Sequence, residues 1–244
     1  MALRKIVGGI MSGKIFKYDP YMLRQFQDKD VDLFIDIGAN KGTTSVMARV
    51  LFPFAKIMAF EPHNETFDIL CTQAKPWGIH CYREAIGNGD EVWFKPGKFS
   101  GVHRFVDKKT FDNSRIKHDA DKRTYPMESL LLSSLFKKYK IKYEKLNYII
   151  KMDCEGCEGS LLKDVEAFDI ISNAMLFTAE IHFGISSATS EIWECWFKIF
   201  EETHTLYELI WVKKGEEYFQ EHILCEEFPI KGRSPQLSLV KKVN

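Results

Sequence analysis

The sequence predicts an α/β fold with a doubly wound, mostly parallel sheet that ends in an antiparallel strand. From Asp32 to Ile181, short apolar runs alternate with amphipathic segments, as in strands buried on both faces and joined by crossover helices. The later part of the chain instead holds strand-like segments separated by turn residues. The chain has 244 residues, of which 45% are hydrophobic, enough for one large core.

The apolar runs of the first region are the expected parallel strands. A strand covered on both faces is continuously apolar rather than alternating. The expected strands are Leu33 to Ile37, Lys56 to Phe60, His80 to Ala85, Leu146 to Asp153 and Leu176 to Ile181.

The segments between these runs carry helical periodicity. After the first strand, apolar residues recur at helical spacing between Thr43, a suitable N-cap, and Pro53, which ends the segment. Further helices are expected at Asn64 to Ala74, Glu128 to Tyr139 and Glu191 to Glu202.

The C-terminal part predicts an antiparallel pair of strands, Leu206 to Val212 and Gln236 to Val240. No repeat or linker divides the chain. We therefore expect a single domain over residues 31–244, preceded by an N-terminal helical extension over residues 1–30.

The net charge is zero, but the charges are unevenly distributed. Lys95 to Lys145 holds 14 Lys/Arg and 6 Asp/Glu, a local charge of +8, whereas Glu191 to Glu227 holds 10 acids and 3 bases, a local charge of −7. Two solvated faces, or a basic lid over an anionic substrate, would each explain this. Gly97 to Tyr125 is too long and irregular for an ordinary loop, so residues 97–145 are expected to form a basic lid or insertion.

Composition excludes several classes of protein. No apolar run approaches the ~20 residues of a membrane helix, and the glycine-broken N-terminus does not resemble a signal peptide, so we expect a cytoplasmic protein with no membrane partner. Six cysteines are too few for a disulfide scaffold, and mostly reduced, buried thiols are expected. Cys154 and Cys157 have the spacing of a zinc or redox pair but lack a second ligand pair.

The most informative stretch joins the first strand to the first helix and reads Asp36-Ile37-Gly38-Ala39-Asn40-Lys41-Gly42. Glycines let a ligand approach the backbone, and a helix start offers unpaired N–H groups. Glu61 follows the second strand, where a carboxylate can accept hydrogen bonds from both hydroxyls of a ribose. Together these features predict a nucleoside pocket; the alternative is a glycine turn and an acid without a ligand.

The glycine spacing distinguishes between nucleoside cofactors. NAD sites show G-x-G-x-x-G with a pyrophosphate over the helix start, whereas the spacing here is G-x-x-x-G and the acid Asp36 stands near the strand end. A carboxylate repels phosphate and suits a cationic amino-acid group. S-adenosyl-L-methionine, with an ammonium, a sulfonium and a ribose, therefore fits better than NAD.

A second stretch, Lys151-Met152-Asp153-Cys154-Glu155-Gly156-Cys157-Glu158, delivers one base and three acids to the carboxyl end of a strand. Ligands of open α/β sheets bind beyond that end, so these groups converge on the predicted nucleoside pocket. The alternative is that these charged residues lie in a solvated loop and have no functional role.

In this order, the motifs resemble the signatures of the FkbM methyltransferases. The resemblance extends from Val31 to about Phe183 and also includes Ala59-Phe60-Glu61-Pro62 and Ala85-Ile86-Gly87. Cysteines stand at two positions where small aliphatic residues are usual, and Gly97 to Tyr125 matches nothing in the family.

The resemblance implies a class I, Rossmann-like methyltransferase with a seven-stranded sheet whose last strand is antiparallel. It implies S-adenosyl-L-methionine as the donor, S-adenosyl-L-homocysteine as the product, and a hydroxyl of a sugar, glycan or natural product as the acceptor. The implied cofactor-binding residues are Asp36, Gly38, Ala39, Asn40 and Gly42 at the methionine end, Glu61 at the ribose with Pro62 beside it, Glu84 and Ala85 near the adenine, and Asp153. The residues implied to face the acceptor are Asp153, Glu155 and Glu158.

Methyl transfer to an alcohol requires an aligned hydroxyl and a group that removes its proton. Asp153 is the first choice as the base, with Lys151 to orient the alkoxide or stabilise it, and His182 on the next strand is the rival base. No metal site is predicted; the alternative is that Asp153, Glu155, Glu180 and His182 gather a divalent cation.

Three other functions stay open. An RNA 2′-O-methyltransferase would use the basic and aromatic residues from Lys137 to Tyr143, although Glu128 to Tyr139 also reads as an amphipathic helix with lysines on its wet face. A silent cofactor-binding module would use the acidic tail as a partner surface, but the acids after Lys151 argue against it. An NAD oxidoreductase is disfavoured by the glycine spacing. The expected partner is therefore a small-molecule or glycan acceptor, anionic if the basic stretch covers it, with RNA as the alternative.

Overall fold

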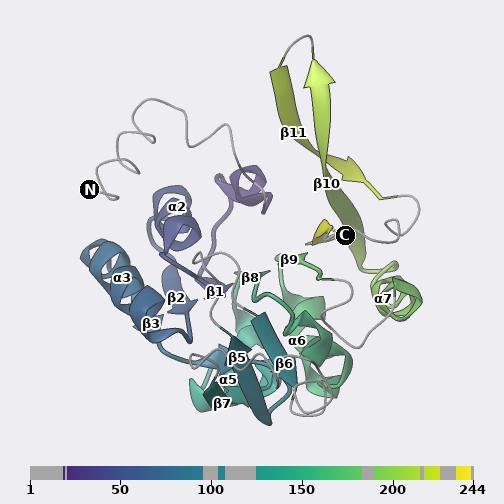
Figure 1. The fold of residues 1–244 in the computed structure, drawn as a ribbon. Coiled ribbons are helices and arrows are strands. Elements are labelled where there is room, and N and C mark those ends of the chain that lie inside the picture. The colour runs from purple at the N-terminus through teal and green to yellow at the C-terminus, as the bar shows by residue number, and fades with distance from the viewer. Residues whose placement is uncertain are drawn as a thin grey trace.

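The computed structural model describes residues 19, 21–95, 104–107, 125–182, 190–214, 217–225 and 235–242. Within them the strands form a sheet of eight and a sheet of four, with helices packed on both faces of the larger sheet (Figure 1). The expected α/β class with a mostly parallel sheet is confirmed.

The larger sheet has the strand order β11-β10-β12-β9-β8-β1-β2-β3. The neighbours from β9 to β3 are parallel, whereas β12 is antiparallel to β9, β10 to β12, and β11 to β10. The strands are β1 (Leu33–Ile37), β2 (Lys56–Phe60), β3 (His80–Tyr82), β8 (Tyr148–Met152), β9 (Leu176–Glu180), β10 (His204–Lys214), β11 (Glu217–Leu224) and β12 (Gln236–Lys241).

Strands β1 and β8 are apolar on both faces because helices cover both sides of the sheet. Phe34 and Ile149 pack into one core cluster, and Ile35 and Ile150 pack into the other. The elements on the first side are η2 (Leu23–Phe26), α2 (Thr43–Leu51), α3 (Asn64–Ala74) and η3 (Lys75–Trp77). The elements on the second side are α5 (Leu132–Lys138), η5 (Tyr143–Lys145), η6 (Glu158–Leu162), α6 (Val165–Asn173) and α7 (Ser190–Lys198).

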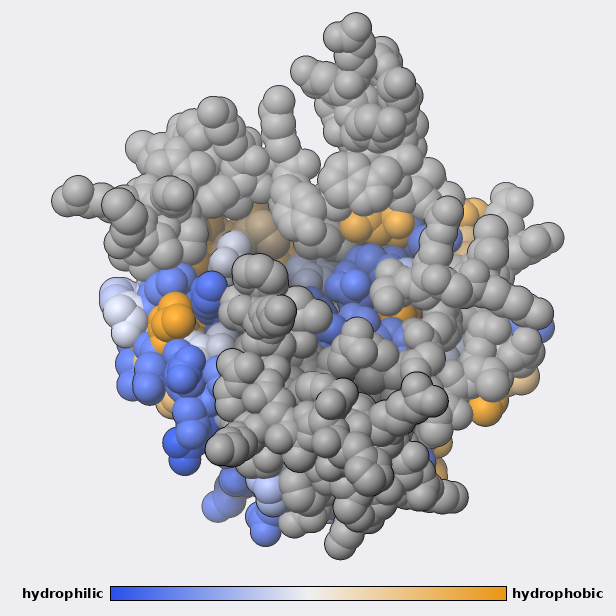
Figure 2. Space-filling view, viewed as in Figure 1, coloured by the Kyte–Doolittle hydropathy of each residue, from blue (hydrophilic) through white to orange (hydrophobic). Residues whose placement is uncertain are grey.

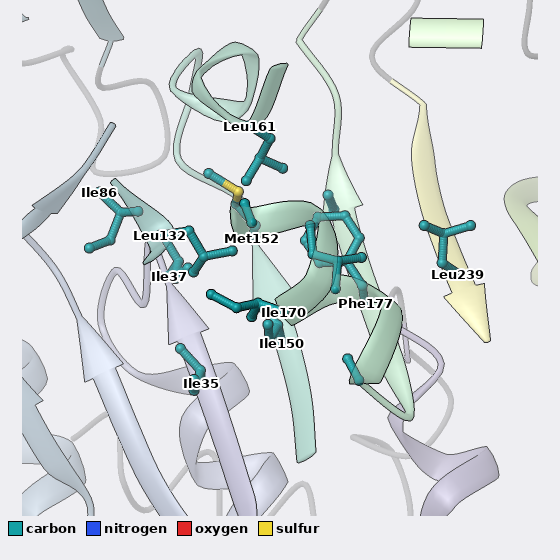
Figure 3. Close-up of a cluster of buried hydrophobic side chains, with 14 of the residues drawn as sticks. Ile35, Ile37, Ile86, Leu132, Ile150, Met152, Leu161, Ile170, Phe177 and Leu239 are labelled. Carbon is teal, nitrogen blue, oxygen red and sulfur yellow. The ribbon is translucent and has the colours of Figure 1, made fainter. Parts of the chain in front are cut away.

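Figure 3 shows the second core, in which side chains of β1 and β8 meet those of α5, η6 and α6. Ile35, Ile37, Leu132, Leu161 and Ile170 are each no more than 3% exposed. Burial of a large aliphatic side chain contributes about 1.5–3 kcal/mol. This layer therefore fixes the position of β1 and β8, from which the candidate site is built.

The smaller sheet corrects two expectations. Its strands are β4 (Ala85–Ile86), β5 (Glu91–Lys95), β6 (Arg104–Asp107) and β7 (Tyr125–Leu130), in the order β4-β7-β5-β6. The expected strand from His80 to Ala85 is therefore divided between two sheets. The expected helix from Glu128 to Tyr139 is wrong in its first part, because β7 runs to Leu130 and extended backbone at Leu131 separates it from α5.

The tail forms the expected antiparallel pair, with Leu206 of β10 opposite Leu239 of β12. The polar stretch between them also contains a strand, β11, which forms a hairpin with β10 and raises the expected seven strands to eight. β12 lies between β9 and β10, so the last strand of the chain is internal to the sheet.

A segment near the N-terminal limit of the described residues contacts β11. His222 Nε2 of β11 lies 2.8 Å from the carbonyl oxygen of Asp19. Of the expected N-terminal helical extension, the structure describes the short η2, and residues 1–18 lie outside the described residues. Much of the expected basic lid, residues 96–103 and 108–124, also lies outside them, whereas α5 packs into the core. Among the described helices, none combines the length and the apolar character that a bilayer crossing requires.

Candidate active site

The predicted site residues collect at the carboxyl ends of β1 and β8. Strand order reverses here, because the chain proceeds from β1 toward β2 and β3 on one side and from β8 toward β9 on the other. Open α/β sheets bind ligands at such a switch point.

A buried ion pair joins the two strands at this point. Asp36 and Lys151 are register partners, and Lys151 Nζ lies 3.0 Å from Asp36 Oδ1. The ammonium also donates to the carbonyl oxygens of Ile37 and Gly38 at 3.2 and 2.8 Å, and Ser45 Oγ donates to Asp36 Oδ2 at 2.6 Å. Asp36 is fully buried and Lys151 is 2% exposed. Asp36 therefore holds the lysine on β8 and Ser45 of the helix α2.

The turn after β1 uses left-handed backbone at three positions. Gly38, Asn40 and Gly42 have φ angles of 73°, 50° and 86°. A Cβ atom at Gly38 would clash with the carbonyl oxygen of Asp153, so only glycine fits where the loops after β1 and β8 touch. Gly42 is the N-cap of α2, and the expected N-cap, Thr43, is its first residue.

Glu61 lies against the same turn. Its Oε2 accepts a hydrogen bond from the Asn40 N–H and its Oε1 from the His63 N–H, both at 3.0 Å. Glu61 is 5% exposed, and this burial raises its pKa to about 7 in spite of the two bonds. The neighbouring Ala39 and Pro62 are buried too. Each carboxylate oxygen accepts about two hydrogen bonds, so each keeps one direction for a further donor.

Glu84 and Tyr139 extend the site beyond the ends of β2 and β3. Tyr139 Oη donates to Glu84 Oε1 at 2.5 Å, and its ring lies 5.8 Å from that of Phe60 and 4.6 Å from that of Tyr82 between centroids. Glu84 Oε2 is buried and has no hydrogen bond among the described residues. Ala85, the neighbour of Glu84, begins β4 and is 3% exposed.

Asp153 directly follows β8, and its side chain is 22% exposed. Its Oδ2 accepts a hydrogen bond from Tyr21 Oη at 2.8 Å and lies 4.0 Å from Lys151 Nζ. Burial alone would lower the pKa of Lys151, but the charges of Asp36 and Asp153 outweigh it and raise that pKa. The lysine therefore stays protonated at neutral pH and attracts the Asp153 carboxylate.

Tyr21 is a site residue that the sequence does not predict. It precedes η2, is 9% exposed, and its ring centroid lies 5.3 Å from Lys151 Nζ. The residues around it carry no recognisable motif, and its contact with Asp153 spans 132 positions of sequence. No local pattern could have identified it.

His182 follows β9 and meets three carboxylates. Its Nδ1 lies 3.1 Å from Glu158 Oε1, and its Nε2 lies 3.3 Å from Glu155 Oε2 and 3.7 Å from Glu180 Oε1. Glu158 is 1% exposed and also accepts the Cys154 N–H at 3.1 Å and the Gly156 N–H at 3.0 Å. Together with Asp153, these residues form an acceptor-side cluster: Asp153, Glu155, Glu158, Glu180 and His182.

Two pKa shifts bear on the roles in this cluster. Burial alone would lower the pKa of His182, but the hydrogen bond to Glu158 and the nearby carboxylates outweigh it and raise the pKa to about 9. With no cation beside it, the ring therefore favours its protonated form at neutral pH. Burial raises the pKa of Glu155 to about 7.

The loop between Asp153 and Glu158 contains a disulfide. Cys154 and Cys157 are bonded, with their Cα atoms 5.7 Å apart. The expectation of reduced thiols is therefore wrong for this pair. The bond encloses Glu155 and Gly156, both of which have positive φ angles, and so restrains the loop that presents Glu155.

Two lysines of the basic segment before β8 are paired with acids. Lys137 Nζ lies 2.6 Å from Glu166, and Lys138 Nζ lies 2.8 Å from Glu84. Tyr143 Oη donates a hydrogen bond to Asp169. These contacts match the interpretation of this segment as an amphipathic helix with solvent-exposed lysines, rather than as an RNA-binding surface.

The residues implied for ribose and adenine fit a nucleoside. Two free acceptor directions on Glu61 suit the two hydroxyls of a ribose, and the unpaired Oε2 of Glu84 suits the amino group of a purine. The space-filling view shows hydrophilic residues near the centre of the face presented in Figure 1 (Figure 2). The structure thus brings the residues of both sequence motifs to one edge of the sheet.

Solved structures that are similar to this chain include several methyltransferases. Methyltransferase FkbM from Methylobacillus flagellatus KT is 14% identical with a TM-score of 0.44, over 86% of this chain and 44% of that chain. An S-adenosylmethionine-dependent O-methyltransferase from Thermotoga maritima is 11% identical with a TM-score of 0.40, over 91% of this chain and 64% of that chain. A precorrin-6y C5,15-methyltransferase from Geobacter metallireducens GS-15 is 12% identical with a TM-score of 0.42, over 91% of this chain and 86% of that chain.

No curated protein matches the sequence. The family model of the methyltransferase FkbM domain matches residues 36–221, well over half of the chain. This range contains β1 with its glycine turn, Glu61, β8 and the acids that follow β8. The chain therefore belongs to the FkbM family of methyltransferases.

Proposed function

We propose that the protein is an S-adenosylmethionine-dependent O-methyltransferase whose acceptor is a hydroxyl of a sugar, glycan or natural-product-like molecule. The observation that carries the proposal is that two acidic residues adjoin one turn. Glu61 accepts a hydrogen bond from the turn at Asn40 and keeps acceptor directions for a ribose, and the backbone carbonyl of Asp153 approaches the turn at Gly38 while the Asp153 side chain is partly open to solvent.

When bound, S-adenosylmethionine supplies a methyl group that is already activated by a sulfonium. The protein's own work is then to hold the donor, align the acceptor hydroxyl and take its proton. Glu61 would hold the ribose and Glu84 the adenine. Lys151, fixed by Asp36 and two backbone carbonyls, sets the position of Asp153.

Asp153 is the proposed base, and Glu155 is the second candidate. Asp153 lies directly at the strand end beside the glycine turn, whereas Glu155 has a pKa of about 7, close to the ideal for a base at neutral pH. If Glu155 is the base, the rate rises with pH around 7 and this dependence disappears in Glu155→Gln. If Asp153 is the base, Asp153→Asn abolishes the rate and Glu155→Gln retains the pH profile.

The charge of the acceptor edge supports a neutral or cationic acceptor over RNA. The partly exposed groups there are Asp153, Glu155 and Glu180, which repel phosphates. Two of the lysines that would have favoured RNA, Lys137 and Lys138, are paired with acids. Activity on an RNA acceptor would fall steeply with added salt, and activity on a neutral glycan would not.

The cytoplasmic location expected from the sequence stays a proposal. A disulfide such as Cys154–Cys157 persists more readily outside a reducing compartment. Alkylation of free thiols in freshly lysed cells would show whether this pair is oxidised in its natural location.

The first experiment is calorimetric titration with S-adenosylhomocysteine, with NADH as the competing ligand. We expect micromolar binding that NADH does not displace and that Glu61→Ala weakens by about 1.5–3 kcal/mol, the cost of losing charge-assisted hydrogen bonds. Absence of binding by folded protein that carries no copurified cofactor would overturn the proposal. Binding would lead to a screen of methyl transfer to neutral glycans and to capped RNA at two salt concentrations.

A further inference from the structure

Metal-ligating atoms converge in the acceptor-side cluster. One carboxylate oxygen of Asp153, one of Glu155 and one ring nitrogen of His182 all lie within 4.8 Å of one another. Ligand atoms bound to one cation at about 2.1 Å stand roughly 3–4 Å apart, so inward movements of no more than roughly 1–2 Å would close the site. Asp153 and Glu155 follow β8 and His182 follows β9, and these two strands are parallel neighbours.

The hydrogen bonding of His182 resembles that of metal-binding histidines. His182 is 6% exposed, and within the described part of the chain its hydrogen bond is the one between Nδ1 and Glu158. Glu158 is itself fixed by the N–H groups of Cys154 and Gly156. Ligating histidines usually donate their second ring nitrogen to a carboxylate, which fixes the ring orientation.

The other ring nitrogen is buried, aimed into the cluster and poorly satisfied. Nε2 lies 3.3 Å from Glu155 and 3.7 Å from Glu180, longer than the 2.7–2.9 Å typical of a charge-assisted hydrogen bond. Three carboxylates lie within 4 Å of the ring nitrogens, an Asp153 oxygen lies within 4.8 Å of one of them, and Lys151 is already paired with Asp36. A proton on the ring or a divalent cation beside it would each offset this excess of negative charge.

We propose that Asp153, Glu155 and His182 bind a divalent cation at the acceptor edge, with Glu158 as the carboxylate that orients His182. Two carboxylate oxygens and one imidazole nitrogen suit a cation such as Mn²⁺, with open positions left for water or an acceptor hydroxyl. A cation there lowers the pKa of a hydroxyl bound to it, which is the difficulty that an alcohol acceptor poses. This role rests on the proposed function, whereas the binding site itself does not.

The test is titration of the full-length protein with Mn²⁺, followed by the electron paramagnetic resonance signal of the free ion. We expect one site per chain. His182→Gln and Glu155→Gln should each weaken binding at least tenfold, and Glu158→Gln should weaken it 10- to 100-fold although Glu158 is not a ligand. Glu166→Gln, which alters an exposed acid paired with Lys137, is the matched control and should leave the affinity unchanged.

Binding of S-adenosylhomocysteine by each variant serves as the test of folding and separates the two proposals. Cofactor binding with no Mn²⁺ site, or with an Mn²⁺ site that survives both His182→Gln and Glu155→Gln, would overturn the cation proposal and leave the methyltransferase proposal intact. Mn²⁺ binding without cofactor binding would overturn the methyltransferase proposal and leave the cation proposal intact. If His182→Gln does not fold, the more exposed Glu155 gives the decisive variant.

Discussion

Glu61 combines burial with two backbone hydrogen bonds, and the balance places its pKa at about 7. Hydroxyl donors of a ribose stabilise the ionised carboxylate, so binding favours loss of the proton. We expect the affinity for S-adenosylhomocysteine to rise with pH from 6 to 8, with release of a proton on binding near pH 7. Calorimetry in buffers of different ionisation enthalpy measures both quantities.

The matched variant is Glu61→Gln, which keeps the shape of the side chain but cannot ionise. Its binding should be weaker at pH 8 and nearly independent of pH. A pH dependence that is unchanged in this variant would show that another group, such as Glu155, is responsible.

Gly38 is required by a close approach as well as by its backbone angle. A Cβ atom there would meet the carbonyl oxygen of Asp153, whereas a Cβ atom at Gly78, which has a similar φ of 68°, would meet nothing within 4 Å. Gly78→Ala should therefore cost about 1–2 kcal/mol, the price of a left-handed backbone for alanine. Gly38→Ala should cost clearly more and abolish cofactor binding. Urea unfolding of both variants measures the difference.

At the scale of elements, the sequence predicts the parallel core well and the smaller sheet poorly. β1, β2 and α3 have the bounds expected from their apolar runs and helical spacing, because the burial of each is read from its own residues. β7 was concealed because its partners β4 and β5 come from a distant part of the chain, and Glu128 to Leu130 continues into a helix of similar composition.

The oxidation state of the two cysteines in the loop after β8 is another feature that the local sequence does not predict. Cross-linking residues three positions apart restricts a short loop of the unfolded chain, which corresponds to about 2 kcal/mol in the chain-entropy account. We expect Cys154→Ser/Cys157→Ser to lower the free energy of unfolding by up to this amount. Urea denaturation with and without a dithiol reductant measures it.

Cys71→Ser is the control, because Cys71 is a free, half-buried thiol outside the loop. The reductant should change the stability of this variant by the same amount as it changes the stability of the wild type. Equal stability of the double variant and the oxidised wild type would show that the bond contributes nothing to the free energy of unfolding.

At the scale of the whole molecule, the final strand bridges two parts of the sheet. β12 pairs with β9 on one side and with β10 on the other, so the hairpin of β10 and β11 is attached through it. Deletion of residues 235–244 should therefore release the hairpin and expose the apolar edge of β9. We expect increased hydrogen exchange throughout β9 and β10, and no such change on deletion of residues 243–244 alone.

The sequence motifs locate the site because they stand at the ends of strands that are recognisable locally. Asp36, Glu61 and Asp153 all lie where that reasoning placed them, at one edge of the sheet. What it could not predict is which groups each side chain contacts. Asp36 faces a buried lysine, and Tyr21 reaches Asp153 from a segment with no motif at all.

The range matched by the family model and the folded unit have different limits. Residues 36–221 exclude Tyr21, which bonds to Asp153, and Asp19 and His222, which contact each other across 203 positions of sequence. They also exclude β12, an internal strand of the sheet. A gene fragment cloned to those limits would encode a protein that lacks part of both its fold and its candidate active site, and its inactivity would reveal nothing about the full-length protein.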